Sequence, residues 1–218
     1  MNMALAGMVI LVMGDSHMAG REYLLTNLHD QLEAQGASVH SYGMCGANAG
    51  DWLYRTTVSC GRGEHNDNSV PITEHNKVEP TWNLNDLIQK AHPNLIVVEL
   101  ADAMAAYGSA QLPRAWIYDQ VRALTGRIKA DNIACVWVGP IWGNEGPPYF
   151  KTAARVKEMS DFLAASVAPC RYIDSTSFAR PGEWPTTDGQ HLTVNGYRQW
   201  GADITNTIVG LKAQLVQR

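Results

Sequence analysis

Apolar residues form short uninterrupted runs along the chain, and longer segments of helical periodicity separate them. The first run covers Met8 to Met13 and ends abruptly at Gly14-Asp15-Ser16-His17. An apolar run without alternation is typical of a parallel strand that is covered on both faces. Further strands are expected at 37–42, 94–100, 133–138 and 170–174. The pattern therefore predicts five strands of one parallel sheet.

The segments between these strands carry apolar residues three and four positions apart. A helix expected at 19–35 places four leucines on one face, and Gly36 lies in the usual stop position. Further helices are expected at 84–91, 113–129, 149–167 and 193–217. Alternating strands and helices predict an α/β fold of three layers, with right-handed crossovers between the strands.

The segment 56–81 interrupts this alternation. It is polar and rich in turn residues, and long irregular segments in compact domains are usually functional or disordered. We therefore expect a loop-rich insertion that faces the substrate, within a single domain that covers residues 1–218. Two histidines of the insertion, His65 and His75, are expected to be surface residues rather than metal ligands.

The composition excludes several classes of function. The 218 residues suit one α/β domain, and a net charge of -4 gives no basic footprint for nucleic acid. No apolar run is long enough to span a bilayer. The cysteines lack the spacing of a zinc site, and neither a metal nor a cofactor is expected. The sequence leaves the oligomeric state open.

Four cysteines permit two disulfides. Cys45 and Cys60 flank one loop-rich segment, and Cys135 and Cys170 lie near the starts of two strands that we expect to be neighbours. Four reduced and partly buried thiols are the alternative. We favour disulfides and hence a periplasmic or secreted protein. The first residues show no basic leader and no cleavage pattern, so a cytoplasmic location is the alternative.

The candidate chemistry lies at the two ends of the chain. Ser16 closes the first strand, at the edge of the sheet where open α/β folds bind ligands. Near the other end, Asp188 and His191 are three residues apart and precede the last expected helix. A serine nucleophile needs a base, and the base needs a group that orients it. His191 can be that base and Asp188 that group. The alternative is that Ser16 is an ordinary helix cap.

The blocks Gly14-Asp15-Ser16-His17 and Asp188-Gly189-Gln190-His191 resemble the first and last sequence blocks of the SGNH (GDSL-type) hydrolase family. The resemblance covers nearly the whole chain. It implies a flavodoxin-like sheet that brings both blocks to one rim, and acyl transfer through a covalent intermediate on Ser16. It also implies an oxyanion hole formed by the N–H of Ser16 and of a glycine after the second strand. Gly46 is the best match for that glycine, with Gly43 next.

The chain departs from the family pattern after the third strand. The family usually has glycine, a variable residue and asparagine there, and Ala103 takes the position of the asparagine, whose side chain normally donates to the oxyanion. Several explanations stay open. Another donor, such as one from the loop near Trp142 and Asn144, replaces it; the protein is a slow esterase or transferase with a different oxyanion hole; it binds without turnover; or the substitution is engineered.

The expected substrate is an acylated glycan or a small ester. Trp52, Trp142 and Trp184 lie in loops that we expect near the rim, where aromatic faces can stack on sugar rings; packing within the loops is the alternative. Together with Asn144 and His17, they are the candidate substrate contacts, and for His17 a structural role is the alternative. We expect an O-acetyl esterase or O-acetyltransferase that acts on a carbohydrate. The alternatives are a catalytically weakened carbohydrate-binding or assembly protein, for which Ala103 argues, and a simple small-ester hydrolase.

Overall fold

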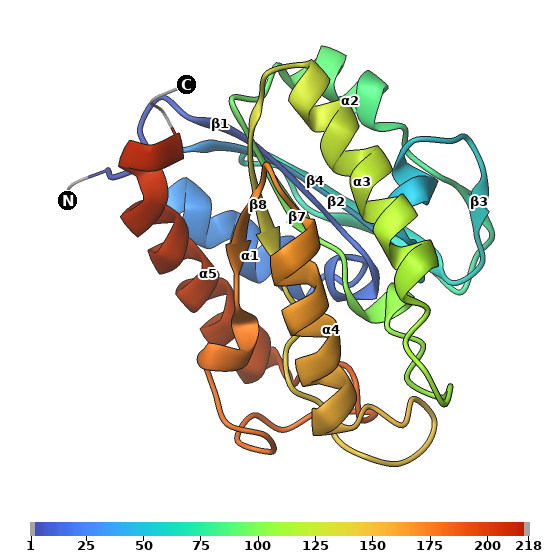
Figure 1. Ribbon diagram of the computed structural model, residues 1–218. Coiled ribbons are helices and arrows are strands. Elements are labelled where there is room, and N and C mark those ends of the chain that lie inside the picture. The colour runs from blue at the N-terminus through green and yellow to red at the C-terminus, as the bar shows by residue number, and fades with distance from the viewer. Residues whose placement is uncertain (1–2, 216–218) are drawn as a thin grey trace.

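The protein is described by a computed structural model over residues 3–215, in which a central sheet lies between two layers of helices (Figure 1). The strands of the sheet are β1 (Val9–Gly14), β2 (Ser38–Met44), β4 (Gly61–Asn66), β5 (Ile72–His75), β7 (Leu95–Glu99), β8 (Ala134–Val138) and β9 (Arg171–Ile173). The α-helices are α1 (Leu24–Ala34), α2 (Leu84–Ala91), α3 (Arg114–Ala130), α4 (Ala153–Ser166) and α5 (Val194–Leu215). The 3-10 helices are η1 (Ser16–Met18), η2 (Ala49–Trp52), η3 (Asp102–Met104) and η4 (Ser175–Ser177).

Five of the strands are parallel and stand in the order β2-β1-β7-β8-β9. Counted along the chain this is the flavodoxin-like order, and the predicted α/β fold of three layers is confirmed. Successive residues of β1 point to opposite faces, so Ile10 and Val12 join one core cluster while Leu11 and Met13 join the other. Helices α1 and α5 cover the first face, and α2, α3 and α4 cover the second (Figure 1).

The sheet has seven strands, not the five that the sequence pattern predicts. The two additional strands come from the segment expected to be loop-rich: β4 pairs antiparallel with β2, and β5 pairs antiparallel with β4. In the same segment β3 (Thr57–Val58) and β6 (Glu79–Pro80) form a separate two-stranded sheet.

Strand β4 escaped prediction because its buried positions are not hydrophobic. They are occupied by Gly61, Gly63 and His65. A Cβ atom on Gly63 would lie 2.7 Å from the Leu25 side chain, so glycine allows α1 to lie close to this edge of the sheet. The usual alternation of apolar and polar side chains is therefore missing, although the strand itself is regular.

Two helices, α1 and α4, begin later in the chain than expected, in segments close to Ser16 and to the pocket. Helix α1 begins at Leu24 instead of residue 19, because η1 and a turn follow Ser16. Helix α4 begins at Ala153, where the Thr152 hydroxyl caps it by accepting from the Arg155 N–H at 3.2 Å. Residues 149–150, expected in that helix, belong to a loop instead. The expected end of the last helix at residue 217 lies outside the described residues.

Both disulfides form as the positions of the cysteines predict. Cys45 and Cys60 join the end of β2 to the start of β4. Cys135 and Cys170 join β8 to the turn that precedes β9, inside the second core cluster on the α3 and α4 side. Among the helices of residues 3–215, none has the length and apolar character needed to cross a bilayer.

Candidate active site

Ser16 lies at the carboxyl edge of the sheet, where β1 ends and η1 begins. The side chain of Asp15 fixes this turn, because it accepts from the His17 N–H at 3.1 Å and from the Ala103 N–H at 3.3 Å. A Cβ atom on Gly43 would lie 2.1 Å from the main chain of Met18. Glycine at this position of β2 is therefore required for η1 to pack against the sheet, and Ser16 is held at the rim.

The loop before α5 brings Asp188 and His191 to the same rim. The Asp188 carboxylate accepts from the His191 main-chain N–H at 2.8 Å and contacts His191 Nδ1 at 2.6 Å. The other ring nitrogen, Nε2, lies 2.8 Å from Ser16 Oγ. Because a carboxylate only accepts, Nδ1 carries the proton, and the Nε2 lone pair faces the serine hydroxyl. The three residues thus form one hydrogen-bonded chain with the geometry of a nucleophile, a base and an orienting acid.

The electrostatics of this chain keep His191 in the form that can accept a proton. Burial, and next the electrostatic effect of the neighbouring His17, lower the pKa of His191, although Asp188 opposes the shift. Burial alone would raise the pKa of Asp188, but hydrogen bonds from His191 and from the Gln190 N–H outweigh it and lower that pKa. At neutral pH Asp188 is therefore ionised and His191 is neutral.

A cavity of about 530 Å³ opens at Ser16 and His191. Tyr149 meets the His191 ring edge-on, with centroids 5.7 Å apart, and Tyr23 stacks on the same ring at 5.5 Å. The cavity is also lined by Tyr107 and Phe150, by small residues of the segment 103–109, and by the Cys45–Cys60 disulfide. Ser16 and His191 therefore face a pocket that is wide enough for a small ester and has aromatic side chains around it.

Two residues that line the pocket, Ser16 and Gly46, offer candidate main-chain donors. Gly46 lines it, is exposed and has a φ of +76°, a conformation that favours glycine. Within residues 3–215, neither the Gly46 N–H nor the Ser16 N–H donates a hydrogen bond. Ala103 also lines the pocket, but its methyl group has no donor, and its N–H is bonded to Asp15. The other glycine considered, Gly43, serves the packing of η1.

The candidate substrate contacts from the sequence do not lie in this pocket. Trp52 is fully buried in the second core cluster. The indole N–H of Trp142 donates to carbonyls in the segment 176–179, and Trp184 packs against the first core cluster. Asn144 bonds Thr186 and Gly189 and so braces the loop of the triad. None of these four residues lines the pocket, so none of them replaces the missing asparagine.

His17 does not contact the pocket either, and belongs to a buried polar network that the sequence did not reveal. Its Nε2 lies 2.7 Å from Asp102 Oδ2, and its Nδ1 lies 2.8 Å from the Tyr197 hydroxyl. The same carboxylate pairs with the ammonium of Lys151 and accepts from the Tyr107 hydroxyl at 2.5 Å. His17 and Lys151 are at most 1 % exposed.

Burial alone would raise the pKa of Asp102, but the positive charge of Lys151 and the hydrogen bonds from His17 and Lys151 hold it well below its usual value. No sequence signal identifies this network, because its members lie far apart along the chain and have no motif spacing. Tyr149 and Phe150 were missed for a different reason: their segment reads as the first turn of a helix.

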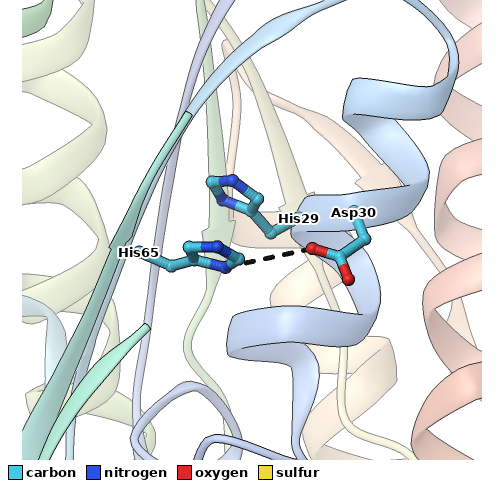
Figure 2. A group of neighbouring side chains, drawn as sticks. All are labelled: His29, Asp30 and His65. Atoms are coloured by element: carbon cyan, nitrogen blue, oxygen red, sulfur yellow. Dashed lines mark ion pairs between the residues drawn. The ribbon is translucent and has the colours of Figure 1, made fainter. Parts of the chain in front are cut away.

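A second group of polar side chains consists of His29 and Asp30 of α1 and His65 of β4 (Figure 2). Within residues 3–215 it is the one cluster with the residue types and spacing of a metal site. His65 is buried, contrary to the expectation of a surface residue. The rings of His29 and His65 are stacked, with centroids 3.7 Å apart and 16° between the planes. Their in-plane lone pairs therefore do not converge on one point. His65 Nε2 also lies 2.8 Å from the Ser69 carbonyl, so it carries a proton. We assign no metal to this group.

The fold, and the arrangement of Ser16, His191 and Asp188, agree with what the resemblance to SGNH (GDSL-type) hydrolases implies. Solved structures support the fold: esterase EstA from Pseudoalteromonas sp. aligns over 94 % of this chain and 98 % of its own, with a TM-score of 0.59 and 16 % identity. A peptidoglycan O-acetylesterase aligns over 97 % and 94 %, with a TM-score of 0.59 and 10 % identity. No protein-family profile matches the sequence.

A relative with detectable sequence similarity shows the family of this chain. Protein BcsX from Komagataeibacter xylinus is 41 % identical over 203 residues, which cover 92 % of this chain and 76 % of BcsX. The chain therefore belongs to the same family as BcsX.

Proposed function

We propose that this protein is a serine-dependent esterase or acyltransferase that removes or transfers short acyl groups, such as O-acetyl, on a carbohydrate. The observation that carries the proposal is the hydrogen-bonded chain from Asp188 through His191 to the Ser16 hydroxyl, open to a pocket of about 530 Å³. This combination of nucleophile, neutral base and orienting carboxylate suits acyl transfer.

In the proposed mechanism, Ser16 Oγ attacks the ester carbonyl while His191 Nε2 takes the hydroxyl proton. The N–H groups of Ser16 and Gly46 stabilise the negative charge on the carbonyl oxygen. The tetrahedral intermediate collapses, the C–O bond to the alcohol breaks, and His191 returns the proton to the leaving oxygen. Water or a sugar hydroxyl, deprotonated by the same imidazole, then attacks the acyl-enzyme and releases the acid or a new ester.

The lining of the pocket supports a short acyl group and a sugar as the leaving alcohol. Ala103, Ala106 and Gly108 line it with little apolar surface, which does not offer a long acyl chain much burial. Phe150 is 49 % exposed at the pocket, and an exposed aromatic face can stack on a sugar ring. One of the structural neighbours is named as an O-acetylesterase of a glycan, peptidoglycan.

The alternative function is a carbohydrate-binding or assembly protein without turnover. Ala103 favours it, because the side chain adds no donor to the oxyanion. Loss of one such donor typically costs about 3–4 kcal/mol in the transition state. The two disulfides further support a periplasmic or secreted location for either function, since disulfides persist in oxidising compartments.

The proposal is tested by hydrolysis of 4-nitrophenyl acetate and by labelling with a serine-directed phosphonate, followed by mass spectrometry. We expect the wild-type protein to release 4-nitrophenol and to gain one phosphonyl group on Ser16. Ser16→Ala loses both signals, whereas Ser109→Ala, a serine variant in the same pocket lining, keeps both. With an acetylated oligosaccharide as donor, release of acetate indicates an esterase, and acetylation of added oligosaccharide indicates a transferase.

A wild-type protein that binds acetylated oligosaccharides but neither hydrolyses short esters nor reacts with the phosphonate would refute the enzymatic proposal and establish the binding function. Hydrolysis of 4-nitrophenyl acetate that persists in Ser16→Ala would refute the assignment of the nucleophile.

A further inference from the structure

Gln190 is a buried polar residue at the centre of the site that the mechanism so far does not use. It is 7 % exposed, lines the pocket and points its amide nitrogen Nε2 at Ser16 Oγ, at 3.5 Å. Among the pocket-lining residues that the structure describes, it is the one with a side-chain amide. We propose that this amide is a catalytic oxyanion donor, in addition to the N–H groups of Ser16 and Gly46. The inference rests on the proposed function.

The distance between Gln190 and Ser16 fits a donor for the reaction intermediate better than a partner of the resting serine. At 3.5 Å, the contact with Ser16 Oγ is at the long limit of a hydrogen bond and is weak. In the tetrahedral intermediate the oxyanion is two covalent bonds from Oγ. It can therefore lie about 2.7–3.1 Å from the same amide nitrogen, the distance that such donors need. The interaction would strengthen as charge develops, which is what accelerates the chemical step.

The main chain of Gln190 is held by the same carboxylate that orients the base. Asp188 Oδ1 accepts from the Gln190 N–H at 2.9 Å and from the His191 N–H at 2.8 Å. The turn is possible because Gly189 has a φ of +93°, and the Gly189 N–H donates to the Thr186 hydroxyl at 3.1 Å. One fixed loop thus presents both the imidazole and the amide to Ser16, so the donor is preorganised together with the base.

The other polar groups of the pocket are less suited to this role. The Ala103 N–H is bonded to Asp15, and the Tyr107 hydroxyl donates to Asp102. Asp102 is ionised and would repel an oxyanion. The hydroxyls of Tyr149, on a ring that meets His191 edge-on, and of Ser109 are the remaining competitors, and Tyr149→Phe and Ser109→Ala test them. The amide of Gln190 is neutral and offers two N–H donors, and it brings no charge that would disturb the pKa of His191.

The test replaces Gln190 with methionine, which keeps the length of the side chain and removes the donor. For 4-nitrophenyl acetate we expect kcat to fall about 100-fold, as for loss of one oxyanion donor, with KM within about threefold of wild type. The rate of phosphonate labelling should fall in parallel, because that reaction passes through a similar oxyanion. Gln190→Glu should be slower still, since its carboxylate repels the developing charge.

The matched control is Gln31→Met, the same substitution at a half-buried glutamine whose amide bonds carbonyls of Asn27 and Arg198. It should leave kcat unchanged, and both variants should keep a cooperative thermal transition. Three results would overturn the inference: a Gln190→Met enzyme with kcat within threefold of wild type, one in which only KM rises, or a loss confined to Tyr149→Phe or Ser109→Ala. Failure of the proposed function is distinguishable, because then the wild-type protein itself shows no turnover and no labelling.

Discussion

Two histidine–aspartate pairs lie side by side at the end of β1. The ring centroids of their histidines, His17 and His191, are 5.2 Å apart. In one, His191 bonds Asp188 and turns its second nitrogen to the Ser16 hydroxyl. In the other, His17 bonds Asp102 and turns its second nitrogen to the Tyr197 hydroxyl. The same two residue types and nearly the same hydrogen-bond lengths therefore occur twice, on either side of one turn.

The difference between the pairs lies in what surrounds them. His191 borders the pocket, where a proton taken from the serine can be passed to a leaving group. His17 is sealed in the interior, and its aspartate also binds the buried ammonium of Lys151. A histidine–aspartate pair can act as a base only where its second nitrogen faces a group that can react. The pair of His17 and Asp102 instead holds η1 and η3 together. Three predictions test this contrast, and another makes a similar comparison between the two disulfides.

The largest expected effect comes from replacing the two histidines by the same residue. We expect His191→Gln to lower kcat for 4-nitrophenyl acetate by about 10⁴-fold, because the base is lost, while the unfolding midpoint changes little. His17→Gln should retain most of kcat and lose about 1–3 kcal/mol of stability, since a buried hydroxyl or carboxylate loses its partner. The measurements are steady-state kinetics and urea denaturation. Equal losses of kcat in the two variants would refute the division of roles.

The aspartates should show the same contrast in stability. Asp102→Asn leaves the Lys151 ammonium buried without a counter-charge, and breaking a buried ion pair in this way typically costs about 3–5 kcal/mol. Asp188→Asn, at a partly exposed position, should change the unfolding free energy by less than about 1 kcal/mol and should act on kcat. Urea denaturation compares the two. The double variant Asp102→Asn with Lys151→Met should recover part of the stability, and no recovery would contradict the assigned ion pair.

The two disulfides allow a similar comparison between a pocket-facing and a buried feature. Their cysteines are 15 and 35 residues apart, so loss of either bridge should cost about 3–4 kcal/mol by the loop-entropy relation. Replacing Cys45 and Cys60 by serine should also lower kcat, because that bridge flanks Gly46. Replacing Cys135 and Cys170 should leave kcat unchanged at temperatures where the protein is folded. Thermal melts and kinetics on both double variants check this, and the reverse pattern in kcat would contradict the role of Gly46.

The smallest expected effect is a shift in the pH dependence of kcat/KM, because His17 of one pair influences the pKa of His191 in the other. Because the pKa of His191 is lowered from 6.5, the neutral base persists as the pH falls, and the acid limb of kcat/KM should lie below pH 6.5. The electrostatic effect of His17 contributes to that lowering, so His17→Gln should move the limb to higher pH. Asp188→Asn should move it to lower pH in its residual activity, since Asp188 opposes the lowering. A pH–rate profile of each variant decides the directions.

Local sequence patterns were sufficient to predict the parallel strands of the core and the three residues of the candidate site, Ser16, Asp188 and His191. Uninterrupted apolar runs identify β1, β7 and β8, because a strand covered on both faces is apolar at nearly every position. The block that contains Ser16 lies where a strand ends, and the block that contains His191 lies where a helix begins. The pattern of apolar residues predicts both of these boundaries. The spacing of the cysteines relative to the strands likewise predicts both disulfides.

Only the tertiary structure decided which residues surround Ser16. Strand β4 lacks a hydrophobic pattern because glycines occupy two of its buried positions. Three tryptophans expected at the rim pack into the protein instead. Lys151 contacts Asp102, although 49 residues separate them along the chain. The physical reason is that hydrophobic periodicity records which side of an element is buried, whereas a polar contact between distant segments depends on how whole elements pack. The sequence by itself therefore determined the parallel core of the fold and the catalytic candidates. Packing decided that His17 is buried in a polar network and that Gln190 faces Ser16.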